Sequence, residues 1–322
     1  MIYVEMLGRM GNQMFSYAHA RYIQNKFPEQ SIGIDFTNFK KEDNTWINYL
    51  QYFKCGDNIQ TAQRKMSFFQ KIGLKVFYSV RRNWHGYAEI YVNEKKWAKL
   101  LSVLNIYIFT NGYYPFKYTD AFQNKLLIGF FESSKYFDEI KPILKEEFKA
   151  KGFEKNEYLK NIIQNITVDQ SICVGVRKGD FASTTNSSYC DICTPSYYEN
   201  AVKLLKQKID NSDNKLCKIY VFTDDVQWAK DNLRFEDEVV YITSSVNGQI
   251  KPWEMVQLMT YFRYYVIPNS SFFWWGQYLS QYDETMVVAP SMWRSENQTV
   301  YKDIYQDEWI LLDPIGIEKK EY

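Results

Sequence analysis

The sequence has no strong excess of either charge and no long apolar run. Its 322 residues include 39 Lys and Arg and 38 Asp and Glu, a formal net charge of +1, so it offers no overall positive field to nucleic acid. No apolar segment approaches the roughly 18 residues that a membrane-spanning helix needs. We therefore expect no nucleic-acid partner and no membrane-spanning helix.

Histidine and cysteine are too scarce to build a metal or redox centre. The chain has two histidines, and Cys190 and Cys193 have no second Cys/His pair at metal-ligand spacing. The cysteines number five, an odd count, and no segment has the character of a signal peptide. These features indicate a reducing compartment, and we expect a cytoplasmic protein that holds no metal and no cofactor.

Several common catalytic and nucleotide-binding motifs are also missing. The chain contains no Asp-x-Asp, a carboxylate pair that holds a metal–nucleotide complex in many transferases, and no Gly-x-Ser-x-Gly of a serine hydrolase. The glycine loop at residues 8–13 has neither the Gly-x-Gly-x-x-Gly spacing nor the lysine of a nucleotide P-loop. A dinucleotide enzyme and a P-loop enzyme are therefore not indicated.

What the sequence does have is length for two domains and many aromatic side chains. A chain of 322 residues is too long for one comfortable core, and we predict domains at 1–165 and 166–322, with the C-terminal segment free to pack back on the first. The 27 Tyr, 22 Phe and 9 Trp suit a sugar site, since flat rings match the C–H faces of pyranoses, but they suit a packed core as well.

Hydrophobic patterns in the first half predict a glycine loop between a strand and a helix. The expected strands are 1–7, 31–36, 105–109 and 125–130, and the expected helices are 14–26 and 155–164. The loop at 8–13 brings backbone N–H groups and two amides close to an anion, although a tight turn alone explains it equally well. Asp35 stands at the end of the second strand.

Residues 60–99 form a basic and aromatic stretch, with nine Lys and Arg against two Glu. This composition fits contact with an anionic membrane surface or with a charged acceptor. A solvated insertion is the interpretation that we favour for it.

The second half alternates between short apolar strands and amphipathic helices. The expected strands are 172–176, 218–222, 239–242, 264–267 and 286–289, and the expected helices are 195–209, 226–233, 252–262 and 272–280. Such alternation predicts a parallel, doubly wound α/β sheet. We expect the aromatic helix at 272–276 to pack in the core rather than to serve as a stacking platform.

Polar and charged residues follow three of these strands, on what parallel pairing makes one edge of the sheet. They are Arg177 to Asp180, Thr223 to Asp225, and Asn269 to Ser271. A guanidinium suits a phosphate, a helix start seats an anion, and an aspartate at a strand end accepts from ribose or guanine. Each signal is equally typical of strand ends and helix caps, but together they indicate a pocket for a nucleoside diphosphate.

Five ordered stretches of the chain resemble the bacterial α-1,2-fucosyltransferases of glycosyltransferase family 11. They are residues 8–18, 129–137, 176–181, 222–225 and 267–276. The corresponding family patterns are Gly-Arg-Leu-Gly-Asn-Gln-Met-Phe, Gly-Tyr-Phe-Gln-Ser-Glu-Lys-Tyr-Phe, His-x-Arg-Arg-Gly-Asp-Tyr, Phe-Ser-Asp-Asp and Asn-Ser-Ser-Phe-Ser-Trp-Trp-Gly. The resemblance runs nearly from end to end of the chain.

This resemblance implies a GT-B fold, two Rossmann-like domains with a cleft between them, that moves L-fucose from GDP-fucose to a galactoside hydroxyl. The transfer would invert the anomeric centre, form an α-1,2 linkage and need no metal. The donor-site residues that it implies are Arg177, Lys178, Asp224, Asp225, Asn269, Ser270 and Ser271. Arg177 and Lys178 would hold the diphosphate, the two aspartates would face guanine or ribose, and Ser270 and Ser271 would seat phosphate.

The first domain would supply the remaining contacts. Asn12, with Gly11 and Gln13 beside it, would reach the fucose or a phosphate. For the catalytic base we expect Asp180 first, with Glu132 and Asp35 as the next candidates, while Arg177 stabilises the leaving diphosphate.

The chain departs from the family pattern beside its central arginine. Gly175 stands where the signature has His, and Lys178 stands where it has a second Arg. A lysine neutralises phosphate only as a point charge.

The expected acceptor is a galactose-terminated oligosaccharide or a lipid-linked glycan, in the making of surface polysaccharide. A cytoplasmic enzyme for such precursors would work at the inner face of the membrane, with residues 60–99 as its peripheral contact. The alternatives are a relative that uses another GDP-sugar or forms another linkage, and an inactive sugar-binding homologue.

Overall fold

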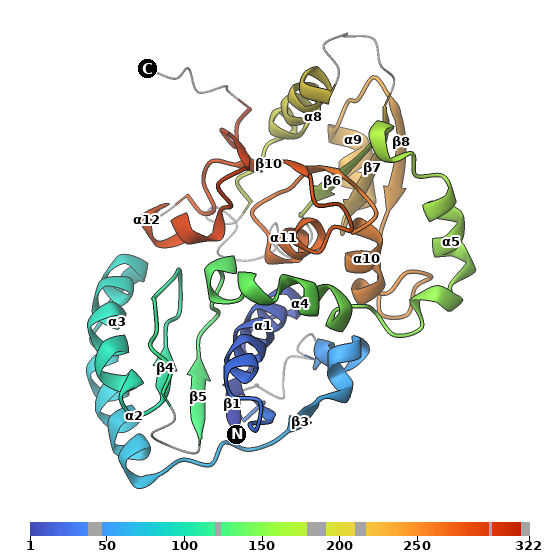
Figure 1. Ribbon diagram of the computed structural model, residues 1–322. Coiled ribbons are helices and arrows are strands. Elements are labelled where there is room, and N and C mark those ends of the chain that lie inside the picture. The colour runs from blue at the N-terminus through green and yellow to red at the C-terminus, as the bar shows by residue number, and fades with distance from the viewer. Residues whose placement is uncertain (38–46, 120–123, 179–190, 210–216, 296–297, 317–322) are drawn as a thin grey trace. The chain divides into compact units, whose positions relative to one another are not determined.

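Two separate parallel β-sheets organise the chain (Figure 1). The computed structural model describes residues 1–37, 47–119, 124–178, 191–209, 217–295 and 298–316. Its contacts divide the chain into unit 1, residues 1–148 and 299–306, and unit 2, residues 149–298 and 307–322. The sequence suggested a boundary at 165/166. Residues 149–165 are grouped with unit 2, where the Ala150 N–H donates to Gln257 and the Asn156 amide donates to the Gln249 carbonyl.

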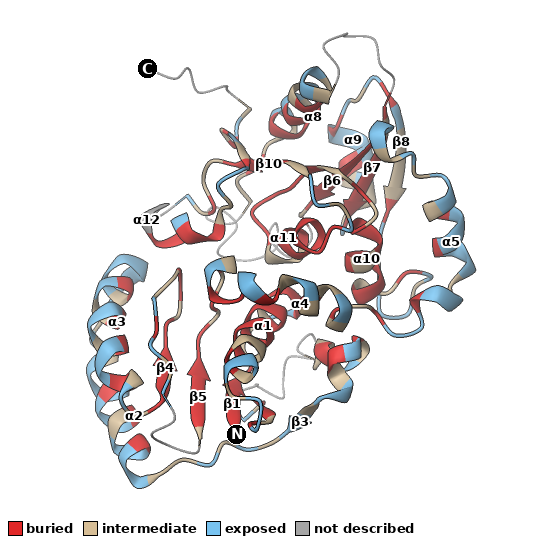
Figure 2. Ribbon diagram, in the orientation of Figure 1, coloured by how far each residue is buried: buried red, intermediate tan, exposed pale blue. Residues whose placement is uncertain are grey.

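The sheet of unit 1 has the order β3-β2-β1-β5-β4, and every neighbouring pair is parallel. Its strands are β1 (Ile2–Glu5), β2 (Ile32–Asp35), β3 (Ile59–Thr61), β4 (Ile106–Ile108) and β5 (Lys125–Ile128). All residues of β1, β2, β4 and β5 are buried, as Figure 2 shows in red. Strands that are covered on both faces read as continuous apolar runs, which is why the sequence revealed these four. It did not reveal β3, whose three residues are largely exposed.

The basic stretch at 60–99 is a structural part of unit 1. It contains α2 (Phe68–Arg81) and most of α3 (Gly86–Ser102), which lie between β3 and β4 in the chain. Their inward side chains, among them Leu74, Phe77 and Leu101, pack with residues of β4 and β5. The expectation of a solvated insertion was therefore wrong, because the outer faces of these helices dominate the composition and conceal the apolar contacts on the inner ones.

The remaining segments of unit 1 are two helices and a series of short 3-10 turns. The helices are α1 (Met10–Lys26) and α4 (Lys141–Glu147), and the turns are η1 (Tyr49–Tyr52), η2 (Lys54–Asp57), η3 (Ser134–Tyr136), η4 (Asp138–Ile140) and η7 (Lys302–Ile304). Pro142 lies in the first turn of α4, where proline is well tolerated. The Lys135 ammonium lies 2.7 Å from the Asp303 carboxylate and ties η7 to η3.

The sheet of unit 2 has the order β11-β10-β9-β6-β7-β8, again with parallel neighbours throughout. Its strands are β6 (Ser171–Val176), β7 (Lys218–Thr223), β8 (Glu238–Ile242), β9 (Tyr264–Val266), β10 (Met286–Pro290) and β11 (Ile310–Leu312). The first five match the predicted strands to within two residues. β11 was not predicted.

Helices lie on both faces of this second sheet. They are α8 (Pro195–Ile209), α9 (Val226–Asn232), α10 (Pro252–Met259) and α11 (Ser271–Tyr278); α5 (Glu157–Gln164) precedes the sheet with the turns η5 (Phe153–Lys155) and η6 (Val168–Gln170), and α12 (Gln298–Tyr301) follows β10. On one face Val174 packs in a core with Tyr197 of α8. On the other, the Phe262 ring lies 5.1 Å from that of Tyr220.

The predicted fold class is thereby confirmed, since both units are Rossmann-like and α/β. The prediction that the aromatic helix at 272–276 packs in the core holds for the two tryptophans, because Trp274 and Trp275 are fully buried. Within the described residues, no helix is long and apolar enough to cross a membrane.

His19 of α1 is fully buried in the core of unit 1. Its Nε2 lies 2.7 Å from the Tyr118 hydroxyl, and its ring lies 4.4 Å from that of Phe131 and 4.5 Å from that of Tyr136. Nδ1 has no hydrogen-bond partner among the described residues. Burial lowers the pKa of His19 to about 3, because an imidazolium would lose its hydration there.

We predict that acid destabilises unit 1 through this histidine. The unfolded chain takes up a proton on His19 below about pH 6.5 and the folded chain does not, so stability is complete above that pH and falls by about 1.4 kcal/mol per unit as the pH drops toward 3. Urea unfolding between pH 4.5 and 7.5 should show this slope and lose it in His19→Gln. The exposed His85, changed to Gln, is the control. An unchanged slope in the His19 variant would contradict the assignment.

Candidate active site

The strand order of the second sheet reverses once, and the reversal marks where a ligand is expected. In unit 2 the chain runs from β6 to β7 and β8 on one side, and then continues with β9, β10 and β11 on the other side of β6. In open parallel sheets, ligands bind outside the carboxyl ends of the strands at such a switch point. The loops after β6, β7 and β9 belong to three adjacent strands. They are the loops that the sequence singled out.

Arg177 follows β6 and is held by the loop after β7. Its Nη1 lies 2.8 Å from Oδ2 of Asp224, and both side chains remain about one quarter exposed. The other carboxylate oxygen of Asp224 accepts the backbone N–H of Lys178 at 2.9 Å. Because a guanidinium has five N–H donors in a fixed plane, this ion pair orients Arg177 without using up its capacity for an anion.

The Lys178 ammonium is buried and contacts other groups of the protein. It lies 2.5 Å from Asp191 and 3.1 Å from the Cys193 carbonyl oxygen, and 4.3 Å from the centre of the Trp228 ring. Its side chain is 8% exposed. These contacts anchor the chain at residues 191–193, and the predicted role of Lys178 as a second phosphate cation stays a prediction.

Two other predicted residues fix the loops on which they lie. Asp225 caps α9, since its Oδ1 accepts the N–H of Trp228 at 2.8 Å. The Asn269 amide donates to the Trp293 carbonyl at 2.9 Å, which ties the loop after β9 to the loop after β10. Contacts of these two side chains with guanine, ribose or phosphate stay predictions.

The amino end of α11 follows β9 at the same edge of the sheet. Ser270 is its N-cap residue, yet the Ser270 side chain makes no capping hydrogen bond, and the backbone N–H of Ser270 donates to Pro268. Ser271 begins the helix and is half-buried. The first N–H groups of a helix have no partner inside it, and together with the helix dipole they attract a phosphate.

Gly175 lies under the first turn of α11. A Cβ at this position would stand 2.3 Å from Cδ1 of Phe273, so the phenyl ring occupies the space of a side chain. Both positions differ from the family pattern, which has His in place of Gly175 and Ser in place of Phe273. The two departures therefore lie in direct contact, which fits an exchange of a large side chain from the strand to the helix.

In unit 1, β1 and β5 are neighbours, so the loops after them leave the sheet at the same edge. After β1, Gly8 has φ +68°, and a Cβ there would stand 2.4 Å from the Asn12 amide nitrogen, so Asn12 folds back over the glycine loop. Gly11 is buried in the first turn of α1. The Ser16 hydroxyl donates to the Gly129 carbonyl at 3.2 Å, which joins α1 to the loop after β5.

The loop after β5 is strained and presents Glu132. A Cβ at Gly129, with φ +149°, would stand 2.1 Å from the Phe109 carbonyl oxygen, and Phe131 has the left-handed φ of +53°. Backbone strain of this kind is concentrated at functional sites. Glu132 comes next and is half-buried. The structure thus brings Asn12, Gly11 and Glu132 to one edge of the first sheet.

Gln13 and Asp35 are engaged by other groups of unit 1. The Gln13 amide donates to the Ile47 carbonyl at 2.8 Å and accepts the Tyr49 N–H at 2.9 Å. Asp35 accepts from Thr37, and its other oxygen lies 3.0 Å from Nε of Arg64.

Arg64 also pairs with Glu5, so one half-buried cation joins the ends of β1 and β2. Our sequence reasoning missed this cluster. The signal that could have revealed it is the acidic residue at the end of each strand, Glu5 in β1 and Asp35 in β2.

Four further residues belong to unit 2. Asp180 lies outside the described residues, and so does Cys190. Burial raises the pKa of the Cys193 thiol to about 12, which leaves it unreactive. Arg294, which the sequence analysis did not single out, is half-buried in the loop after β10. Within the described residues, no group of three or more His, Cys, Asp or Glu could hold a metal.

The sequence model of glycosyl transferase family 11 matches residues 107–313. An alpha-1,2-colitosyltransferase of Escherichia coli is 24% identical over 318 residues, which cover 97% of this chain and 99% of that protein. The O-antigen biosynthesis glycosyltransferase WbnK of the same species is 26% identical over 331 residues, covering 97% and 100%. A galactoside 2-alpha-L-fucosyltransferase of Caenorhabditis elegans is 23% identical over 186 residues, 55% of this chain and 48% of that one.

Among solved structures, the NodZ alpha-1,6-fucosyltransferase soaked with GDP-fucose superposes with a TM-score of 0.49 at 12% identity, covering 87% of this chain and 92% of that chain.

We predict that Gly175 and Phe273 depend on each other energetically. Gly175→His alone overpacks the first turn of α11, and Phe273→Ser alone leaves a cavity; each should cost about 2 to 4 kcal/mol of unfolding free energy. The double variant should recover at least about 1 kcal/mol of their sum. Urea unfolding of the four proteins measures this coupling. Gly175→His combined with Phe272→Ser is the control that should recover nothing, and additive losses in the first pair would refute the exchange.

Proposed function

The chain belongs to glycosyl transferase family 11, and from this membership we propose that it moves L-fucose from GDP-fucose to a galactoside hydroxyl, with inversion and an α-1,2 linkage. That it is a glycosyltransferase follows from the family. The donor, the acceptor and the linkage are the proposal.

The observation that carries the proposal is that Arg177 and the start of α11 follow neighbouring strands at the switch point of unit 2. β6 and β9 are neighbours, so the loop that bears the guanidinium lies beside the loop that bears the helix start. A diphosphate has two groups of anionic oxygens to satisfy. A planar cation and a set of backbone N–H groups are the two kinds of donor that proteins use for them.

Fucosyl transfer breaks the bond between the anomeric carbon and the diphosphate oxygen while the acceptor oxygen bonds to that carbon from the opposite face. Negative charge grows on the departing diphosphate. Arg177, oriented in advance by Asp224, and the N–H groups near Ser271 would stabilise this charge without reorganising. Because the protein supplies this positive charge itself, we propose that the reaction needs no metal.

The acceptor hydroxyl must lose a proton as it attacks, and a carboxylate is the base that we propose. Asp180 follows Arg177 in sequence, and Glu132 follows the strained Phe131 in the loop after β5. Asp35 is less suited, since Arg64 and Thr37 already engage its oxygens.

The acceptor is the second part of the proposal. A relative of nearly full length is named for O-antigen biosynthesis, and glycan chains of that kind carry sugar hydroxyls as acceptors. We propose a galactose-terminated oligosaccharide or lipid-linked glycan, modified in the cytoplasm at the inner face of the membrane.

A second donor is favoured by one specific observation. The relative named a colitosyltransferase matches 97% of this chain, whereas the relative named a fucosyltransferase matches 55% of it. A colitosyl donor is therefore the alternative to the fucosyl one.

We predict that GDP-fucose is consumed in preference to GDP-mannose and GDP-galactose when the donors compete, with no loss of rate in EDTA. The assay mixes the three with a panel of galactosides and analyses the linkage of each product. An inactive sugar-binding protein would not hydrolyse any donor even slowly. Preference for a colitosyl donor added to the same mixture would replace the fucosyl proposal by its alternative.

We also predict that Arg177→Ala lowers kcat by about 10²- to 10³-fold and weakens GDP binding, because the growing charge loses its oriented cation. Arg263→Ala is the control, since that arginine forms ion pairs with the exposed Asp169 and Glu284. Steady-state kinetics and calorimetry with GDP measure both effects. Near-normal values in Arg177→Ala would remove the phosphate role, and Glu132→Gln beside Asp180→Asn in the same assay separates the two candidate bases.

A further inference from the structure

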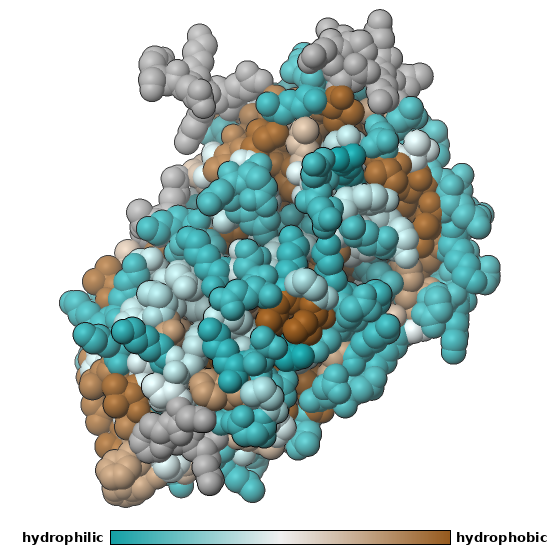
Figure 3. All heavy atoms as spheres, viewed as in Figure 1, coloured by the Kyte–Doolittle hydropathy of each residue, from teal (hydrophilic) through white to brown (hydrophobic). Residues whose placement is uncertain are grey.

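The outer face of α2 carries a row of large apolar side chains that the protein does not cover. Phe69, Ile72, Val76 and Val80 are 62%, 45%, 47% and 38% exposed, and Phe68 beside them is 71% exposed. Their spacing of three and four residues places them on one side of a helix. Figure 3 shows brown, hydrophobic spheres at the lower left, where Figure 1 draws α2 and α3.

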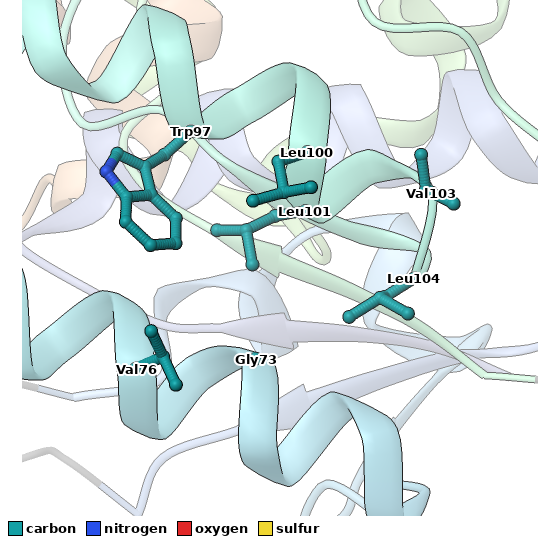
Figure 4. A pocket seen from close by; sticks show the side chains of 7 residues that line it. All are labelled: Gly73, Val76, Trp97, Leu100, Leu101, Val103 and Leu104. Carbon is teal, nitrogen blue, oxygen red and sulfur yellow. The ribbon is translucent and has the colours of Figure 1, made fainter.

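A groove between α2 and α3 extends this row. It has a volume of about 330 Å³ and is lined by Gly73, Val76, Trp97, Leu100, Leu101, Val103 and Leu104. Figure 4 shows Val76 on one helix facing the side chains of Trp97 and Leu101 on the other side of the groove. Leu100 and Val103 are more than 60% exposed. The apolar surface therefore spans both helices and is open to the outside.

Positive charge borders this apolar surface. On α2 the exposed Lys71 and Lys75, and Arg82 just after it, share the side of the helix next to the apolar row. On α3, Lys96 and Lys99 are exposed. Within the described residues, no ion pair involves any of these five.

The two acidic residues of the stretch at 60–99 are engaged locally. Glu94 pairs with Arg81, and Glu89 accepts the backbone N–H of His85. The positive charge at the border is therefore not neutralised by them.

We propose that this surface, formed by the outer faces of α2 and α3, docks on an anionic lipid bilayer. A helix with aromatic and aliphatic residues on one side and lysines at its border lies in a membrane interface with the apolar side buried. Lysines near such a surface attract its acidic headgroups. In a symmetric dimer through the same face, each basic border would meet its own copy, which like charges oppose.

This docking would bring unit 1 to the place where a lipid-linked acceptor lies. It builds on the proposed acceptor class but is tested without it, because vesicle binding needs neither a sugar donor nor turnover. A failed donor assay therefore would not count against membrane docking. Failed vesicle binding likewise would not count against the proposed donor.

The test is flotation of the full chain with vesicles of phosphatidylcholine alone or mixed with phosphatidylglycerol. We expect binding to the anionic vesicles that falls as salt is added. Ile72→Gln with Val76→Gln should lower the partition coefficient at least about tenfold, and Lys71→Gln with Lys75→Gln about 25-fold.

Matched controls lie in unit 2. Val246→Gln replaces a side chain that is 46% exposed, close to Val76 at 47%. Lys203→Gln with Lys208→Gln removes the same charge from exposed positions of α8. Both controls should bind vesicles as the unmodified chain does, and a thermal melt of each variant shows that it is folded.

Three outcomes would overturn the proposal. The first is that the unmodified chain does not bind the anionic vesicles. The second is that the control variant Lys203→Gln with Lys208→Gln loses as much binding as Lys71→Gln with Lys75→Gln. The third is that light scattering finds a dimer that Ile72→Gln with Val76→Gln dissociates, which would make this face a contact between two copies.

Discussion

Parallel pairing of strands is the constraint on which the chemistry of this molecule depends. Among the described residues every strand pair is parallel, so each loop that follows a strand emerges at the same edge of its sheet. Residues that are far apart in sequence, such as Arg177 and Ser271, thereby become neighbours by topology. The reversal of strand order then separates the crossover helices and leaves room beside the central strands.

The sequence predicted the second sheet well because its signals are local. Short apolar strands alternate with helices there, and the helix at 195–209 matches α8 residue for residue. The sequence did not predict β3 and β11, because each has only three residues, too few to show a recognisable hydrophobic pattern. Residues 60–99 were misinterpreted because this stretch has both exposed and buried aromatic residues. The sequence alone does not separate the two groups, so the face of each helix that packs in the core could not be recognised.

Side-chain roles were harder to predict than positions. Asp225 and Gln13 do come after the expected strands, but one caps a helix and the other binds the backbone at residues 47 and 49. Lys178 meets Asp191, and Arg177 meets Asp224. Such partners come from distant parts of the chain, so composition and spacing could not distinguish a residue that binds a ligand from one that holds the loop.

The contact between Gly175 and Phe273 limits the order in which an ancestral sequence could have changed. From the family's His and Ser, one route passes through His with Phe, where two large groups would compete for the space that the ring now fills. The other passes through Gly with Ser, which loses packing but creates no clash. Evolution toward the present pair is therefore expected to have lost the imidazole first, and once the ring was in place a single mutation could no longer restore the histidine.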